Sequence, residues 1–170
     1  MSHDALAVLL DKQAITEVIH GYCRALDRME RDAALGIWHA DGTADYPPFF
    51  TGTGAGFVDW VWEMHAAMTG HSHQISNILI EVDGDHAVSE SYVTVALQSA
   101  AGPGRTAETV VRGRYLDRWS RRADRWALDA RRHVVDLQTV TLHDAAMTAV
   151  EPHDGASARD TADPSYALFR

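Results

Sequence analysis

The 170-residue sequence has one cysteine, Cys23, and its 15 basic residues are outnumbered by 24 acidic ones. A single cysteine can form neither an internal disulfide nor a cysteine-based zinc cluster, and one thiol in a chain of this size is typical of a reducing compartment. The net charge of −9, with histidine neutral, argues against nucleic-acid binding through phosphate neutralisation. The composition therefore favours a small-molecule partner over a polyanion.

The sequence also lacks long apolar runs and the common motifs for a serine nucleophile, a phosphate or a dinucleotide. No apolar run approaches the roughly 20 residues that a membrane-spanning helix needs, and the N-terminus lacks the basic segment and cleavage site of a secretory signal. We therefore expect a cytoplasmic protein with no membrane partner. The sequence contains no GxSxG, P-loop or GxGxxG motif, which disfavours nucleophilic, phosphoryl-transfer and nicotinamide chemistry.

Helical periodicity dominates the first 70 residues. Apolar residues with helical spacing predict a long first helix, a shorter helix over Asp32–Trp38, and a third helix from Phe57 to Met68. Between the last two, Thr43–Tyr46 predicts a short strand, and Phe49–Gly56 predicts a glycine-rich connection.

The period changes from 3.6 to 2 after residue 71. Strands are predicted over 78–82, 87–98, 106–119 and 125–140, with a hairpin at Asp83-Gly84-Asp85. This order predicts an α+β domain over 1–142, in which three N-terminal helices cover one face of a strongly curved, mostly antiparallel sheet. Residues 143–170 predict a tail whose apolar end, Tyr166-Ala167-Leu168-Phe169, packs over a pocket or a subunit interface.

Asp27 and His73 are the main candidates for chemistry. Asp27 lies where the first helix ends, and a carboxylate there opposes the helix dipole unless a hydrogen-bond donor is near. His73 lies where the chain enters a strand, and its imidazole could be that donor, which would leave the other ring nitrogen as a base. The alternative is structural: backbone groups satisfy His73, and Asp27 caps the next turn.

A second interpretation concerns His71, which points to the same strand face as His73. Two such imidazoles and Asp27 have the composition of a three-ligand metal site. No further cysteine or histidine motif supports a metal, so we expect none and no other cofactor; His71 is assigned to substrate binding.

Several other residues are candidates for an enclosed sheet face, although aromatic residues at such spacing are more often part of a plain core. Tyr22 and Tyr46 carry phenols that can donate a proton to a substrate oxygen. Arg131 and His133 share one strand face and can stabilise an oxyanion there, or Arg131 can instead pair with Asp117 or Asp129 at the surface. The remaining substrate-binding candidates are Trp38, Phe49, Tyr92 and Tyr115.

Three short segments carry a resemblance to a known family: Tyr22-Cys23-Arg24-Ala25-Leu26-Asp27, Trp38-His39-Ala40-Asp41-Gly42 and His73-Gln74-Ile75-Ser76-Asn77-Ile78. Over Leu6–Val140 the sequence resembles the SnoaL-like branch of the nuclear transport factor two-like superfamily, and within it the scytalone dehydratases, bile-acid 7α-dehydratases and hexachlorocyclohexane dehydrochlorinases. The resemblance implies a cone-shaped α+β barrel with a hydrophobic pocket.

The resemblance also implies an activity and roles for three residues. His73 would be the general base, Asp27 its carboxylate partner, and Tyr22 the group that polarises a substrate oxygen. The implied function is a cofactor-independent lyase that eliminates water, halide or a small carbonyl compound from a hydrophobic cyclic or aromatic substrate. Two alternatives stay open: an isomerase or polyketide-type cyclase, and a non-catalytic structural subunit of a ring-hydroxylating dioxygenase.

Related proteins also suggest a homodimer or homotrimer. The sequence favours this through an exposed sheet face, to which the alternation in the third strand assigns Val111, Tyr115 and Trp119.

Overall fold

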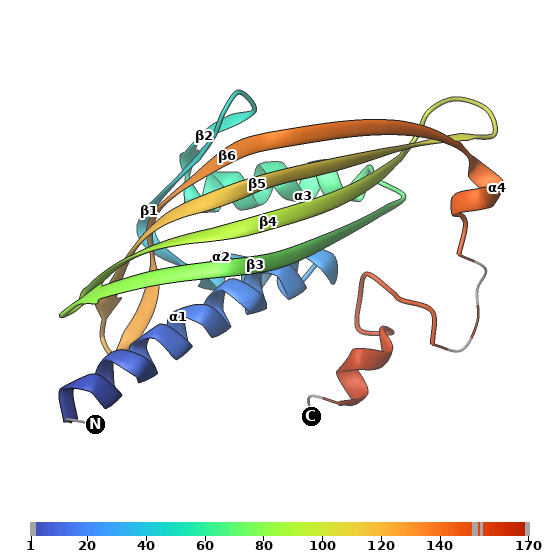
Figure 1. Ribbon diagram of the computed structural model, residues 1–170. Helices are drawn as coiled ribbons and strands as arrows, with labels where there is room; N and C mark the ends of the chain where they lie inside the picture. Colours follow the sequence, from blue (N-terminus) through green and yellow to red (C-terminus); the bar gives the residue numbers. More distant parts are fainter. Residues whose placement is uncertain (1–2, 151–152, 154, 169–170) are drawn as a thin grey trace.

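The computed structural model describes residues 3–150, 153 and 155–168. Helices precede a long meander of strands (Figure 1). In chain order the elements are α1 (His3–Asp27), α2 (Arg31–Gly36), β1 (Trp38–Tyr46), β2 (Phe50–Thr53), α3 (Gly54–Ala66), β3 (Gly70–Asp83), β4 (His86–Ala100), β5 (Arg105–Arg122), β6 (Arg125–Asp144), α4 (Ala145–Thr148) and the 3₁₀ helix η1 (Pro164–Ala167).

The six strands form one curled sheet in the order β2-β1-β6-β5-β4-β3. Every neighbouring pair is antiparallel except β1 and β6. The long strands arch over α1, and α3 packs against β1 and β2 on the same side (Figure 1). The α+β class and the curved, mostly antiparallel sheet are thus confirmed. The sheet is not closed, because β2 and β3 remain its two edges.

The core lies between the concave face of this sheet and the helices. Helix α1 buries Ile15, Ile19, Tyr22 and Leu26, whose spacing of three to four residues forms the stripe that the periodicity predicts. Strand β4 buries every second residue from Ala87 to Val95, as a period of two requires. The β3–β4 hairpin turns at Gly84, which has a φ of +59° that glycine adopts without steric cost.

Two predicted boundaries in the N-terminal half are wrong. Helix α2 ends at Gly36, and Trp38 begins β1 instead of ending the helix, because its indole packs against Gly54 and Phe57 of α3. The predicted connection Phe49–Gly56 contains strand β2, which pairs with β1 from Thr43 to Tyr46.

The predicted exposed sheet face is also wrong. Tyr115 and Trp119 are only 3% and 1% exposed, because the odd-numbered residues of β5 point toward the helices. The Trp119 Nε1 donates a hydrogen bond to Ser89 Oγ at 2.9 Å inside the core. These residues cannot form a subunit contact, so the predicted homodimer or homotrimer stays a prediction without this support.

The described part of the C-terminal segment, residues 145–150, 153 and 155–168, begins with α4 and ends near the end of α1 (Figure 1). Ion pairing of Arg28 with Asp163 and a hydrogen bond from Tyr166 to Glu30 fasten it there. Strand β6 runs to Asp144, beyond the predicted end at 140. Phe169, part of the predicted apolar end, lies outside the described residues. None of the helices within the described residues is long and apolar enough to cross a membrane.

Candidate active site

Asp27 and His73 meet where the end of α1 packs against the beginning of the edge strand β3. Oδ1 of Asp27 lies 2.7 Å from the ring Nδ1 of His73, and Oδ2 accepts a hydrogen bond of 3.0 Å from the His73 backbone N–H. An ionised carboxylate can only accept, so it favours the tautomer in which Nδ1 carries the proton. Within the described part of the chain, no group hydrogen-bonds to Nε2 of His73, which leaves its lone pair available.

Two more histidines pack around this pair. The Nε2–H of His71 donates to the Leu26 carbonyl at 3.0 Å, and the ring of His65 from α3 stacks on His71 with centroids 4.2 Å apart. Burial lowers the pKa of His65 to about 3 and also lowers the pKa of His71, so both rings are neutral near pH 7. Across the described residues, acidic, histidine and cysteine side chains nowhere form a group able to hold a metal ion.

A second polar cluster lies deeper under the sheet. The ring of His133 is 5.3 Å from that of Tyr46 and 5.5 Å from that of Tyr115, and the guanidinium of Arg131 lies 4.0 Å from the Tyr115 ring centroid. Arg131 donates two hydrogen bonds, of 2.7 and 2.8 Å, to Asp117, and neither side chain is exposed. Arg131 therefore pairs with one of the two predicted acids, inside the protein and not at its surface.

The tyrosines of this cluster stay protonated at neutral pH, so their hydroxyls can donate hydrogen bonds. Burial raises the pKa of Tyr46 above its ordinary value, and it raises the pKa of Tyr22 and Tyr115 further. Burial also lowers the pKa of His133 to about 4, with Arg131 as a second cause, so this imidazole is neutral.

Several buried polar atoms in and around the cluster have no hydrogen-bond partner among the described residues. They include Oη of Tyr22, Oη of Tyr46, Oγ of Ser91, Nη1 of Arg131 and Nε2 of His133. A buried polar group without a partner is costly, so a cluster of them is typical of a place that receives a polar ligand or water. The sequence analysis missed Ser91, because a single serine in a strand gives no signal until its inward orientation is known.

Two predicted substrate-binding residues lie elsewhere. Phe49 is 64% exposed in the turn between β1 and β2, and Tyr92 is 43% exposed because the even-numbered residues of β4 face outward. Neither can line an enclosed pocket. Trp38 is buried in the core against Phe57, and its role in binding stays a prediction.

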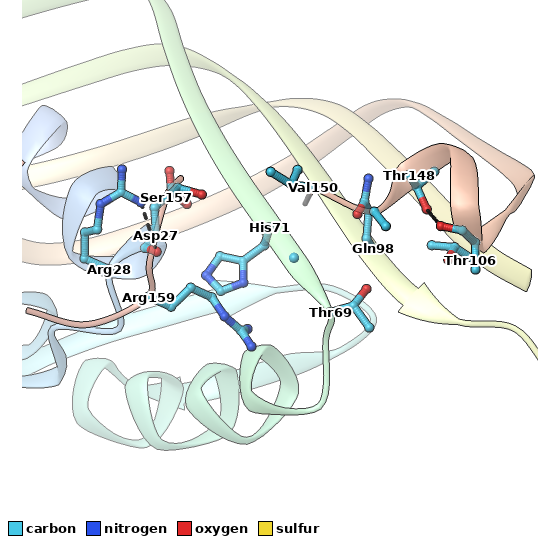
Figure 2. Close-up of a pocket in the computed structure, with 13 residues that line it drawn as sticks. Asp27, Arg28, Thr69, His71, Gln98, Thr106, Thr148, Val150, Ser157 and Arg159 are labelled. Carbon is cyan, nitrogen blue, oxygen red and sulfur yellow. Dashed lines mark hydrogen bonds between the residues drawn. The ribbon is translucent and has the colours of Figure 1, made fainter. Parts of the chain in front are cut away.

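Two cavities are lined by Asp27, and the smaller of them is also lined by His73. A cavity of about 490 Å³ lies between the end of α1, the beginning of β3, the end of β4 and the C-terminal segment (Figure 2). Its lining includes Asp27 and His71 together with Gln98, Thr148 and Arg159. A second cavity, of about 350 Å³, is lined by His73 and Asp27 with residues of α1. A cavity of several hundred Å³ suits a small ring compound.

Comparison with known proteins gives a family match over most of the chain. Residues 7–132 match the model of the SnoaL-like domain. None of the curated proteins matches.

Solved structures show the same fold. A provisionally assigned scytalone dehydratase from Novosphingobium aromaticivorans is 22% identical, with a TM-score of 0.69 over 77% of this chain and 87% of that chain. The type 3 hexachlorocyclohexane dehydrochlorinase LinA from Novosphingobium barchaimii is 16% identical, with a TM-score of 0.72 over 81% and 94%. A protein from Kribbella flavida is 20% identical, with a TM-score of 0.70 over 78% and 95%.

Proposed function

The chain belongs to the SnoaL-like domain family, and from that premise we propose that it is a cofactor-independent lyase acting on a hydrophobic cyclic or aromatic compound. The observation that carries the proposal is the hydrogen bond of 2.7 Å between Asp27 and Nδ1 of His73, which leaves Nε2 with a lone pair. A dehydratase and a dehydrochlorinase among the structural neighbours are consistent with elimination.

His73 is the general base of the proposed reaction. Its Nε2 removes a proton from a carbon atom next to an activating group, and the C–H electrons form a C=C bond as the bond to the leaving group breaks. Asp27 stabilises the imidazolium that forms, because its carboxylate is already bonded to Nδ1. A positioned base of this kind contributes about 10² to 10⁴ in rate.

The phenols of Tyr22 and Tyr46 complete the mechanism as hydrogen-bond donors to the departing oxygen or halide. Both hydroxyls are buried and lie close to each other, neither makes a hydrogen bond of ordinary geometry to a described residue, and their raised pKa keeps them protonated. Nη1 of Arg131, which takes no part in the pair with Asp117, is a further hydrogen-bond donor toward the negative charge that develops. When hydroxide leaves, the proton that it needs to become water comes back from the imidazolium of His73.

The test is product analysis with a panel of cyclic alcohols and cyclohexyl halides that carry an acidifying neighbouring group. Mass spectrometry separates the candidate reactions, because elimination removes the mass of water or hydrogen halide whereas isomerisation and cyclisation conserve mass. We expect elimination that is lost in His73→Gln and kept in a control, His86→Gln, which changes an exposed histidine of the β3–β4 hairpin. Conversion without mass change favours the isomerase or cyclase, and no conversion of the whole panel supports the structural-subunit alternative.

A further inference from the structure

Arg159 is a half-buried cation in the wall of the larger cavity. Its Nη1 donates a hydrogen bond of 2.9 Å to the backbone carbonyl of His65, which is a neutral partner. Among the described residues, no carboxylate lies within ion-pair distance of Arg159, whereas the nearby Arg28 is paired with Asp163. A partly desolvated guanidinium without a counter-ion is stabilised by an anion that enters the cavity.

The rest of the cavity wall is suited to a polar group. Figure 2 shows Arg159 extending from the C-terminal segment to a position close to His71, with hydroxyl and amide side chains on the opposite side. They are Thr69, which directly precedes β3, Gln98 of β4, Thr106 of β5 and Thr148 of α4. Among the described residues of the lining, Asp27 is the only acidic one, and both of its oxygens are already bonded to His73.

From this arrangement we propose that the cavity binds a carboxylate of the substrate through Arg159. The inference rests on the proposed function for the reaction itself and adds the substrate class: a ring compound with an acidic substituent, whose ring lies toward His71 and Asp27. A guanidinium can form two parallel hydrogen bonds to a carboxylate, and Arg159 has donors left after its bond to His65. Arg159 lies beyond residues 7–132, so this specificity belongs to the C-terminal segment and not to the part that matches the family model.

The test is calorimetric titration with two probes of nearly the same shape, benzoate and benzamide. We expect the protein to bind benzoate at least about tenfold more tightly than benzamide, since a hydrogen bond to a charged group contributes more than a neutral one. Arg159→Gln is expected to lower the affinity for benzoate by at least about tenfold and to leave benzamide binding unchanged. Arg159→Lys keeps the charge and is expected to retain part of the preference.

Two controls make the outcome specific. Arg112→Gln removes the same charge from an exposed position of β5, and we expect it to change neither affinity. His73→Gln is expected to keep benzoate binding, so a failure of the proposed reaction is distinguishable from a failure of the subsite. Equal affinity for the two probes, no measurable benzoate binding, or an unchanged benzoate affinity in Arg159→Gln would overturn the inference.

Discussion

Both carboxylate oxygens of Asp27 are bonded to His73, one to the ring Nδ1 at 2.7 Å and the other to the backbone N–H at 3.0 Å. The second bond fixes the position of the carboxylate relative to the strand, so that the first can fix the orientation of the ring. The Asp27 side chain thus joins the end of α1 to both the backbone and the ring of His73 in β3.

Replacing Asp27 by asparagine is expected to change the tautomer of His73. The amide oxygen can accept from the backbone N–H, which turns the amide NH₂ toward Nδ1 and moves the ring proton to Nε2. We expect turnover to fall by about a hundredfold or more with little change in KM, and ¹⁵N chemical shifts of His73 to report the changed tautomer. A variant with normal turnover and the tautomer changed would show that Nε2 is not the base.

Removal of Arg131 is expected to destabilise the fold. Arg131→Met leaves Asp117 buried without its partner, which costs about 3 to 5 kcal/mol in the free energy of unfolding. Replacing both residues by apolar side chains, as in Arg131→Met with Asp117→Leu, is expected to recover most of this loss. Urea denaturation measures both variants, and equal stability of the single and double variants would contradict the account of a buried pair.

Acid is expected to destabilise the protein through His65 and His133. Burial lowers the pKa of His65 to about 3 and that of His133 to about 4, whereas in the unfolded chain both titrate near 6.5. Between these values the unfolded state binds more protons, so the free energy of unfolding falls as the pH decreases from about 6.5 toward 4.

A variant isolates the contribution of His65. In His65→Gln the loss of stability between pH 7 and pH 4.5 is expected to be about 2 kcal/mol smaller than in the native protein. Urea titrations at the two pH values measure the difference. An identical loss in both proteins would show that His65 is not held neutral.

The close approach at Gly113 predicts a steric effect. A Cβ atom there would lie 2.2 Å from the Val134 carbonyl oxygen and 2.9 Å from Nε2 of His133, next to a register shift between β5 and β6. Gly113→Ala is expected to lower the free energy of unfolding by about 1 to 3 kcal/mol. The melting temperature is expected to fall with it. The control is Gly21→Ala in α1, where nothing lies within 4 Å and alanine is expected to stabilise the helix.

The sequence predicted the structure best where the spacing of residues or the charge at a helix end was enough to place a side chain. Asp27 opposes the helix dipole and His73 lies where the chain enters a strand, so local rules made their contact one of two interpretations, and the family resemblance favoured it. The position of Trp38 could not be predicted, because the helical spacing of apolar residues continues through it. In the structure Trp38 lies in a strand, where its indole packs against Gly54. Arg159 and Ser91 stood out in no local pattern, since their significance depends on neighbours distant in sequence.

Proton transfer by His73 can be measured most directly through exchange with solvent. In D₂O, a ring compound with an acidic C–H bond and a carboxylate substituent is incubated with the native protein and with His73→Gln, and deuterium incorporation or elimination is followed by NMR. The account predicts a rate in the native protein at least about a hundredfold above that of His73→Gln, with His86→Gln as fast as native. Equal rates for native protein and His73→Gln would contradict it.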